Sequence, residues 1–348
     1  MNSTAECCCR LSLSVALAVG MLSSSATAQL APPTGASYGG SVPNSRKVVS
    51  GIAWHGVLSE GLAESKRTGK PVLFITAAPQ CGGVTGMWCP GKQNMDRSFL
   101  SNKQLIKISR EFVCIRTATY EDKKEASFLK WAFLRSPSAD LRNFGFCILS
   151  PGGKRQLRRS RRGPNFVYKN SAAMAADLKL IARQFSRKTT RSDPDLAVPR
   201  MKSVRLGINV ASCDGLPSVV VFGKNKKDVD QLNSKLSGVI WDETLAGKFI
   251  YASTTKFADL KMVSGATMKP GILVIEPGVY GMSGRMIKMI GASVSRQDLK
   301  RDLVVAADTF TRRSKSHGLH VRNGRRGGKT WKTEVPVPNR VRSRRRKR

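Results

Sequence analysis

The sequence predicts an α/β protein in which a mixed β-sheet lies between two layers of helices, built as two diverged copies in tandem. Short buried strands alternate with amphipathic helices along both halves of the 348-residue chain. Each half begins with a βαβ pattern and closes with a hairpin followed by a helix, which requires a sheet with both parallel and antiparallel neighbours. The length agrees with two domains.

The first 28 residues have the pattern of a signal peptide. Arg10 precedes a short apolar run, Leu11–Leu22, and Ser23–Ala28 ends in the small-x-small pattern of a cleavage site. The run is too short to span a bilayer. We therefore expect export to the periplasm or secretion to the extracellular space, with no transmembrane helix after cleavage.

The first domain is expected over residues 51–186, after a flexible lead-in (29–50) rich in Pro, Gly and Ser. Its strands are short apolar runs, its helices carry apolar residues at helical spacing, and Gly69 ends the first helix. Pro151-Gly152-Gly153 is the turn of the closing hairpin. In chain order, we predict helix 52–68, strand 72–77, helix 94–110, strand 112–116, helix 124–134, strands 144–149 and 154–159, and helix 171–186.

The second domain is expected over residues 204–310, after a polar and basic linker (187–203) that contains Pro194 and Pro199. The same patterns recur in a similar order, which indicates a second and more degenerate copy. They predict strands 206–211 and 219–222, helix 226–236, strand 249–252, short helix 256–263, strands 272–275 and 285–290, and helix 295–310.

The formal charge of +37 is concentrated in two places. Residues 311–348 hold fifteen Lys/Arg and one acidic residue, and a second basic cluster runs from Lys154 to Arg162. We expect the segment 311–348 to be a disordered basic tail that attracts polyanions. Behind a signal peptide no nucleic acid is expected, and an anionic lipid surface, an acidic polysaccharide or an acidic protein is the better partner. A solvated basic face without a partner is the alternative.

The order of elements resembles the thioredoxin superfamily, in particular exported thioredoxin-like domains of bacterial proteins. The resemblance covers roughly residues 52–186. The residues that carry it are Gly69-Lys70-Pro71-Val72-Leu73-Phe74, Met95 and Phe99, Phe112-Val113, and Ser150-Pro151-Gly152-Gly153-Lys154. It implies a thioredoxin-like three-layer sandwich, and a second, weaker copy over residues 204–310.

The resemblance also implies two thiols at the start of a helix, where the helix dipole lowers the pKa of the first thiol and the second resolves the mixed disulfide. Here that motif is broken. The family's spacing, counted forward from Lys70-Pro71, places the first cysteine of the motif at Cys81. The same spacing, counted back from Met95, places that cysteine at Cys89. A loop insertion, residues 82–88, accounts for the difference.

Cys81 and Cys89 allow four interpretations: a structural disulfide across the glycine-rich loop, a reactive pair, a Cu(I) site, or unpaired thiols. The Cu(I) site would use sulfur from Met87 or Met95, with His55 as a candidate ligand. If the pair is reactive, Cys89 is the preferred nucleophile. Lys92 would then lie in the first turn of the following helix and could stabilise a thiolate at Cys89. Alternatively, Lys92 is an ordinary exposed lysine.

Other features depart from the family or add little chemistry. Phe144 stands where the family places a cis-proline, whereas the second copy keeps Pro270 but lacks motif cysteines. Cys114 and Cys147 fall within predicted strands as buried apolar residues. His317 and His320, at i and i+3, could bind a metal, but such pairs in basic tails are usually exposed to solvent. No cofactor and no resident metal are predicted.

Two functions remain open from the sequence. The first is thiol–disulfide exchange with protein thiols or disulfides, by an oxidoreductase that uses Cys81 and Cys89. The second is a redox-inactive binding scaffold whose basic tail supplies electrostatic attraction.

Overall fold

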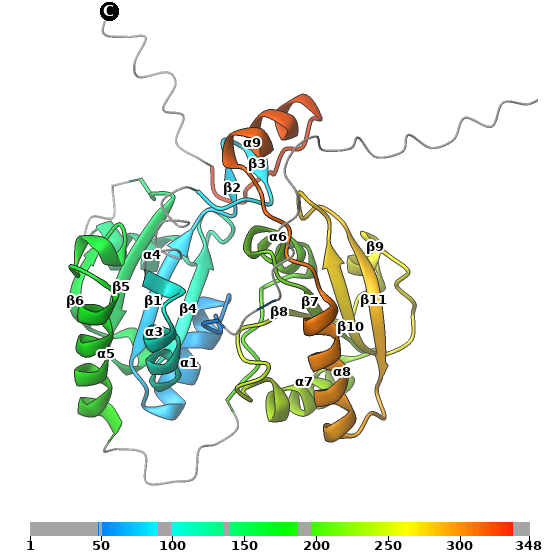
Figure 1. Cartoon of the computed structure of the whole chain (residues 1–348), viewed down its shortest axis with the longest axis horizontal. Coiled ribbons are helices and arrows are strands. Elements are labelled where there is room, and N and C mark those ends of the chain that lie inside the picture. The colour runs from blue at the N-terminus through cyan, green and yellow to red at the C-terminus, as the bar shows by residue number, and fades with distance from the viewer. Residues whose placement is uncertain (1–47, 49–50, 90–98, 135–139, 187–195, 337–348) are drawn as a thin grey trace, which may run out of the picture. The chain divides into compact units, whose positions relative to one another are not determined.

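The computed structural model describes residues 48, 51–89, 99–134, 140–186 and 196–336, all within one compact unit, Pro43–Arg348. The predicted signal peptide and most of the predicted lead-in and linker lie outside these residues. Within the described part of the chain, no helix is long and apolar enough to cross a membrane. The fold contains two mixed sheets (Figure 1).

The first sheet has the strand order β4-β1-β5-β6. β1 (Val72–Ala77) pairs in parallel with β4 (Val113–Ala118) and antiparallel with β5 (Phe144–Leu149). β6 (Gln156–Arg161) pairs antiparallel with β5 and is an edge strand. β1 is fully buried on both faces, which explains why its sequence is a continuous apolar run rather than an alternating one.

Helices cover both faces of this sheet. Leu73, Ile75, Phe146 and Ile148 point to one face and pack with residues of α3 (Lys103–Ile108) and α5 (Ser171–Ser186). The alternate residues, which include Phe74 and Ile115, pack on the other face with α1 (Leu58–Thr68) and α4 (Ala126–Leu134). The period-2 alternation of the strands thus produces two cores and three layers. Short 3-10 helices lie at Ser109–Glu111, Pro151–Gly153 and Pro164–Phe166.

The second sheet repeats this arrangement, with the order β8-β7-β10-β11-β9. Its strands are β7 (Ser218–Phe222), β8 (Ile250–Thr254), β9 (Val263–Ser264), β10 (Gly271–Pro277) and β11 (Gly284–Gly291). β7 is parallel to β8 and antiparallel to β10, as β1 is to β4 and β5. One face packs with α6 (Val204–Asp214) and a 3-10 helix (Phe257–Leu260), and the other with α7 (Lys226–Ile240) and α8 (Arg296–Thr309). The short edge strand β9 was not predicted.

Several predicted elements differ in the structure. Within the described part of the helix predicted over 94–110, Asn102 is extended (ψ 131°) and caps α3, which begins only at Lys103. Residues 206–211, predicted as a strand, belong to helix α6, which Ser203 caps by accepting a hydrogen bond from Leu206 N and which Gly215 ends at φ 66°. Most of α6 is buried, so apolar residues occupy more than one face and hide the helical period. The helix predicted over 52–68 begins only at Leu58, since His55 instead pairs with β4 by hydrogen bonds to Cys114 O and from Arg116 N.

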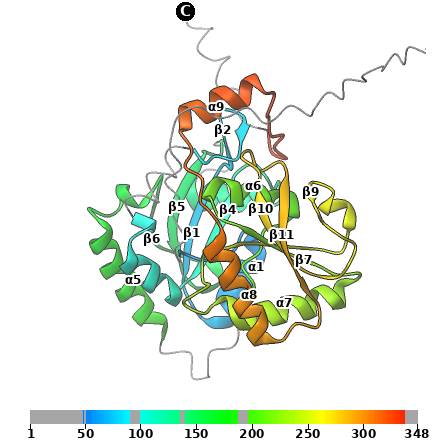
Figure 2. The same cartoon turned by 45° about the vertical axis from the view of Figure 1, so that its right-hand side comes forward.

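The segment predicted as a disordered tail has a defined conformation over residues 311–336. It contains helix α9 (His317–Arg326), which packs on the small hairpin formed by β2 (Gln80–Cys81) and β3 (Val84–Thr85). Both views show α9 beside this hairpin (Figure 1, Figure 2). Residues 337–348 lie outside the described part of the chain.

Candidate thiol site

The predicted loop insertion after Cys81 begins as a tight hairpin. Cys81 in β2 pairs with Val84 in β3, and the two intervening residues, Gly82 and Gly83, have φ of 58° and 82°. A two-residue hairpin turn with positive φ at both positions favours glycine, because a Cβ is strained there. The glycines that suggested a flexible loop instead fix Cys81 at the end of a strand.

Asn209 of α6 holds both ends of this hairpin. Its Oδ1 accepts hydrogen bonds from Thr85 Oγ1 (2.6 Å) and Gly86 N (2.9 Å), and its Nδ2 donates to Pro79 O (3.3 Å). Asn209 is fully buried. A buried amide with three satisfied hydrogen bonds orients the hairpin more strictly than apolar packing alone.

Trp88, the residue before Cys89, is anchored by a buried ion pair. Its Nε1 donates to Asp214 Oδ1 (2.6 Å), and Asp214 also pairs with the Arg116 guanidinium, which is only 2% exposed. The guanidinium carbon of Arg116 lies 5.0 Å from the centroid of the Trp88 ring, a cation–π distance. These contacts fix the backbone that leads into Cys89.

The Cys81 and Cys89 thiols are hydrogen-bonded to each other, and both residues are half-buried. No disulfide joins cysteines in the described part of the chain. Asn143 Nδ2 approaches Cys89 Sγ at 3.9 Å. The hydrogen bond with Cys89, together with burial, raises the pKa of the Cys81 thiol, while Arg325 acts in the opposite direction. Cys81 therefore holds its proton at neutral pH and can donate it toward Cys89.

A third group, absent from the predicted site, completes the arrangement. His317 Nε2, from the first residue of α9, lies 2.8 Å from Cys81 Sγ. The tautomer of His317 sets the roles in this contact: an unprotonated Nε2 can accept the Cys81 proton, whereas a protonated Nε2 donates to the Cys81 sulfur. The sequence contains one signal, the spacing of His317 and His320, but a histidine pair in a basic tail predicts exposure to solvent rather than a contact with a thiol.

Helix α9 is held over the hairpin by contacts along its length. His320 is buried, and its Nε2 lies 2.8 Å from Thr85 O; burial lowers the pKa of this imidazole. Gly324 faces Val84 so closely that an added Cβ would lie 2.2 Å from Val84 Cγ1. Beyond the helix, Trp331 N donates to Gly83 O (3.2 Å), and Trp331 Nε1 donates to Glu121 Oε1 (2.7 Å).

Lys315 anchors the chain just before α9. Its Nζ lies within 2.6–2.8 Å of four oxygens, which belong to Gly86, Ser212 (backbone and hydroxyl) and Val279. Burial lowers the pKa of Lys315 to about 8. Part of the basic tail is therefore committed to internal contacts that position His317.

The other residues considered in the sequence analysis either lie outside the described residues or are buried within strands. Lys92, with Pro90 and Met95, lies outside the described residues, so its predicted role stays a prediction. Cys114 and Cys147 are buried in β4 and β5; burial raises the pKa of the Cys114 thiol to about 12 and that of Cys147 further. Neither has the exposed surroundings of a reactive thiol.

The described residues contain no cluster of three or more His, Cys, Asp or Glu side chains suited to hold a metal ion. His55, a candidate ligand in the Cu(I) interpretation, is buried beside β4, and its ring stacks with Trp241 at 6.4 Å between centroids. Burial lowers the pKa of His55 to about 4. The structure thus gives His55 a packing role.

Comparisons with known proteins find only distant structural similarity. No protein-family model and no curated protein matches the chain. A zinc-bound form of human ERp44 is 13% identical, with a TM-score of 0.25 over 72% of this chain and 58% of that one. A crystal structure of human ERp44 is also 13% identical, with a TM-score of 0.25 over 82% of this chain and 98% of that one. The chain thus spans less than two thirds of the first of these proteins.

Proposed function

We propose that this protein is an exported thiol–disulfide exchange protein in which Cys89 attacks and Cys81 resolves. One observation carries the proposal: Cys81 Sγ is hydrogen-bonded to the Cys89 thiol and lies 2.8 Å from His317 Nε2. The contact brings together two sulfurs and a proton acceptor, the groups that a two-step exchange requires.

The first step is attack by the Cys89 thiolate on a sulfur of a substrate disulfide. A mixed disulfide forms, the substrate S–S bond breaks, and one substrate sulfur leaves as a thiolate. Cys81 supports this step by donating its S–H hydrogen bond to the Cys89 sulfur, which favours the charged form there. The raised pKa of Cys81, caused by that hydrogen bond and by burial, keeps it protonated during the attack.

The second step uses His317. The imidazole Nε2 takes the Cys81 proton, and the resulting thiolate attacks Cys89 Sγ, which releases the second substrate sulfur. The substrate gains two electrons, and Cys81 and Cys89 become a disulfide. The reverse sequence oxidises a substrate dithiol, so the direction depends on the redox potential of the partner.

The fold supports the same proposal in a weaker way. Both sheets place a first strand between a parallel and an antiparallel neighbour and carry helices on both faces, the arrangement expected for two thioredoxin-like domains. Fold alone does not establish exchange activity. The proposed partners are protein thiols or disulfides, and an anionic surface or polysaccharide for the basic residues beyond those packed on the hairpin.

The alternative is a redox-inactive scaffold of the same fold. It is favoured by one observation, the raised pKa of Cys81, because the resolving step requires a Cys81 thiolate, and a raised pKa opposes its formation.

Alkylation of Cys89 as a function of pH distinguishes the exchange protein from the redox-inactive scaffold. Mass spectrometry identifies the labelled cysteine. Exchange predicts that Cys81→Ala shifts the labelling midpoint of Cys89 upward by about one pH unit, while Cys81→Ser, which keeps a donor, restores most of it. Equal midpoints in all three proteins would support the scaffold.

A further inference from the structure

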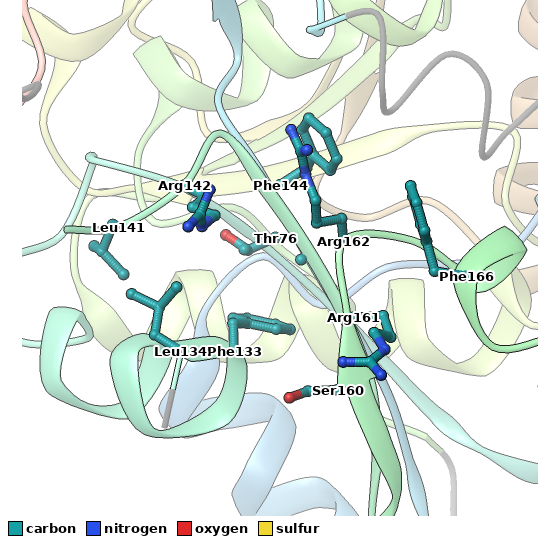
Figure 3. Close-up of a pocket in the computed structure, with 11 residues that line it drawn as sticks. Thr76, Phe133, Leu134, Leu141, Arg142, Phe144, Ser160, Arg161, Arg162 and Phe166 are labelled. Carbon is teal, nitrogen blue, oxygen red and sulfur yellow. The ribbon is translucent and has the colours of Figure 1, made fainter. Parts of the chain in front are cut away.

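A second candidate site, lined by none of the thiols, is a cavity of about 460 Å³ beside the first sheet. It lies near the thiol site in the chain, since Asn143, between the lining residues Arg142 and Phe144, is hydrogen-bonded to Cys89 Sγ. It is bounded by the C-terminal end of α4, the start of β5 and the end of edge strand β6 (Figure 3). This volume lies within the range of sites that hold small organic ligands. Nothing in the thiol chemistry uses it.

Most of the wall is apolar. The side chains that form it are Phe133, Leu134, Leu141, Phe144 and Phe166. Gly145 helps to shape the wall, since an added Cβ at this position would lie 2.5 Å from the Phe133 ring. Phe166, which also lines the cavity, is 57% exposed.

The rim is cationic. Arg142, Arg161 and Arg162 line the cavity, all three are exposed, and no Asp or Glu is among the described residues that line it. None of the three forms a salt bridge with another described residue. The Arg162 guanidinium lies 5.0 Å from the centroid of the Phe144 ring, which places its charge over the apolar wall, as Figure 3 shows.

The inner surface offers one hydroxyl to a ligand. Ser160 is buried, and no hydrogen bond to its side chain occurs within the described residues. The neighbouring Thr76 hydroxyl is already bonded to Thr119 Oγ1 at 2.7 Å. The cavity therefore combines an apolar wall, one available hydroxyl and a rim of arginines, and a guanidinium group is suited to hold a carboxylate in a bidentate pair.

We propose that this cavity binds a free medium-chain aliphatic carboxylate, with its chain against the phenylalanine and leucine wall and its carboxylate held at the arginine rim. The lining contains no carboxylate or carboxamide side chain that could accept hydrogen bonds from sugar hydroxyls, which argues against a saccharide. An inorganic anion would leave the apolar wall unused. A chain of about ten carbons suits a cavity of this size.

The test is isothermal titration calorimetry of the purified full-length protein with decanoate, below its micelle concentration and at low salt. We expect one molecule to bind per chain, and 1-decanol, which lacks the charge, to bind at least about tenfold more weakly. The triple variant Arg142→Gln/Arg161→Gln/Arg162→Gln should also lose at least about tenfold in affinity. Ser160→Phe, which fills the cavity from inside, should abolish binding while the circular dichroism spectrum stays unchanged.

The matched control is Arg155→Gln/Arg159→Gln. It removes two charges from the same hairpin at positions outside the cavity lining and should change affinity by less than about twofold. No decanoate binding, equal binding of decanol, or an equal loss in this control would overturn the proposal. Arginine-dependent cosedimentation with phosphatidylglycerol vesicles without decanoate binding would also overturn it and would assign the patch to a lipid surface.

Discussion

His317 Nε2 lies 2.8 Å from Cys81 Sγ, although 236 positions separate the two residues in the chain. The contact depends on α9, which places a proton acceptor beside the thiol that we assign to the resolving step. His317→Gln should therefore leave formation of the mixed disulfide at Cys89 nearly unchanged and slow its resolution by about 100-fold or more. Single-turnover reaction with a model disulfide, quenched with acid and followed by mass spectrometry, measures both steps. Equal slowing of both steps, or of neither, would contradict the role given to His317.

The position of α9 on the hairpin can be tested with two glycines of the same helix. At Gly324 an added Cβ would lie 2.2 Å from Val84 Cγ1, so Gly324→Ala should push α9 away from β3 and increase alkylation of Cys81 several-fold. At Gly318 an added Cβ meets no atom within 4 Å, so Gly318→Ala is the matched control.

Gly318→Ala should stabilise the helix by about 0.5–1 kcal/mol and leave the alkylation rate of Cys81 unchanged. A faster rate in both variants, or in neither, would mean that α9 does not govern access to Cys81.

The buried ion pair beside Cys89 predicts a large effect on stability. Asp214→Ala removes the carboxylate that pairs with Arg116 and the acceptor of Trp88 Nε1, and it leaves the guanidinium buried without its counter-charge. We expect the free energy of unfolding in urea to fall by about 3–5 kcal/mol. Arg116→Met in the same background should restore part of the loss, because it removes the uncompensated charge.

Asp298→Ala is the control for that measurement. Asp298 also pairs with an arginine, Arg301, and accepts a hydrogen bond from Ser295 Oγ, but both members of the ion pair are largely exposed, so the loss should be much smaller than for Asp214→Ala. Similar losses in the Asp214 and Asp298 variants would show that the buried pair has no special effect.

His55 predicts how stability changes with pH. Its pKa is lowered by burial to about 4 in the folded protein, against 6.5 for an unperturbed histidine, so between these values the unfolded chain binds more protons. Stability should therefore fall as the pH drops from 6.5 to 4, by about 3 kcal/mol from this residue. His55→Phe keeps a ring against Trp241 and should lose about 3 kcal/mol less over the same range, measured by urea unfolding. Parallel pH profiles for the two proteins would contradict the burial of a neutral imidazole.

Local sequence patterns predict much of the fold. Strands β1 and β5 and helix α5 have the predicted bounds, because each is a continuous apolar run or an amphipathic repeat with clear ends. Helix α6 was missed since its burial removes the polar face that reveals a helical period. Residues 52–57 were mistaken for helix because their pairing partner, β4, lies far along the chain.

The thiol site is less visible in the sequence. Cys81 and Cys89 are recognisable in the sequence as two nearby cysteines with a glycine-rich segment between them. The residues that orient them, however, come from distant segments of the chain. Asn209, Asp214 and His317 have no local signal that connects them to a cysteine, and the basic composition around His317 indicates disorder. Contacts of this kind depend on tertiary structure, which composition and periodicity do not specify.

The most direct test of the proposed exchange is a glutathione redox titration of the purified protein, with mass spectrometry to assign the bonded sulfurs. We predict a single Cys81–Cys89 disulfide with a reduction potential between about −120 and −270 mV, the range of thiol oxidoreductases. A bond that stays oxidised below about −300 mV, or no bond between these two cysteines at any potential, would contradict it.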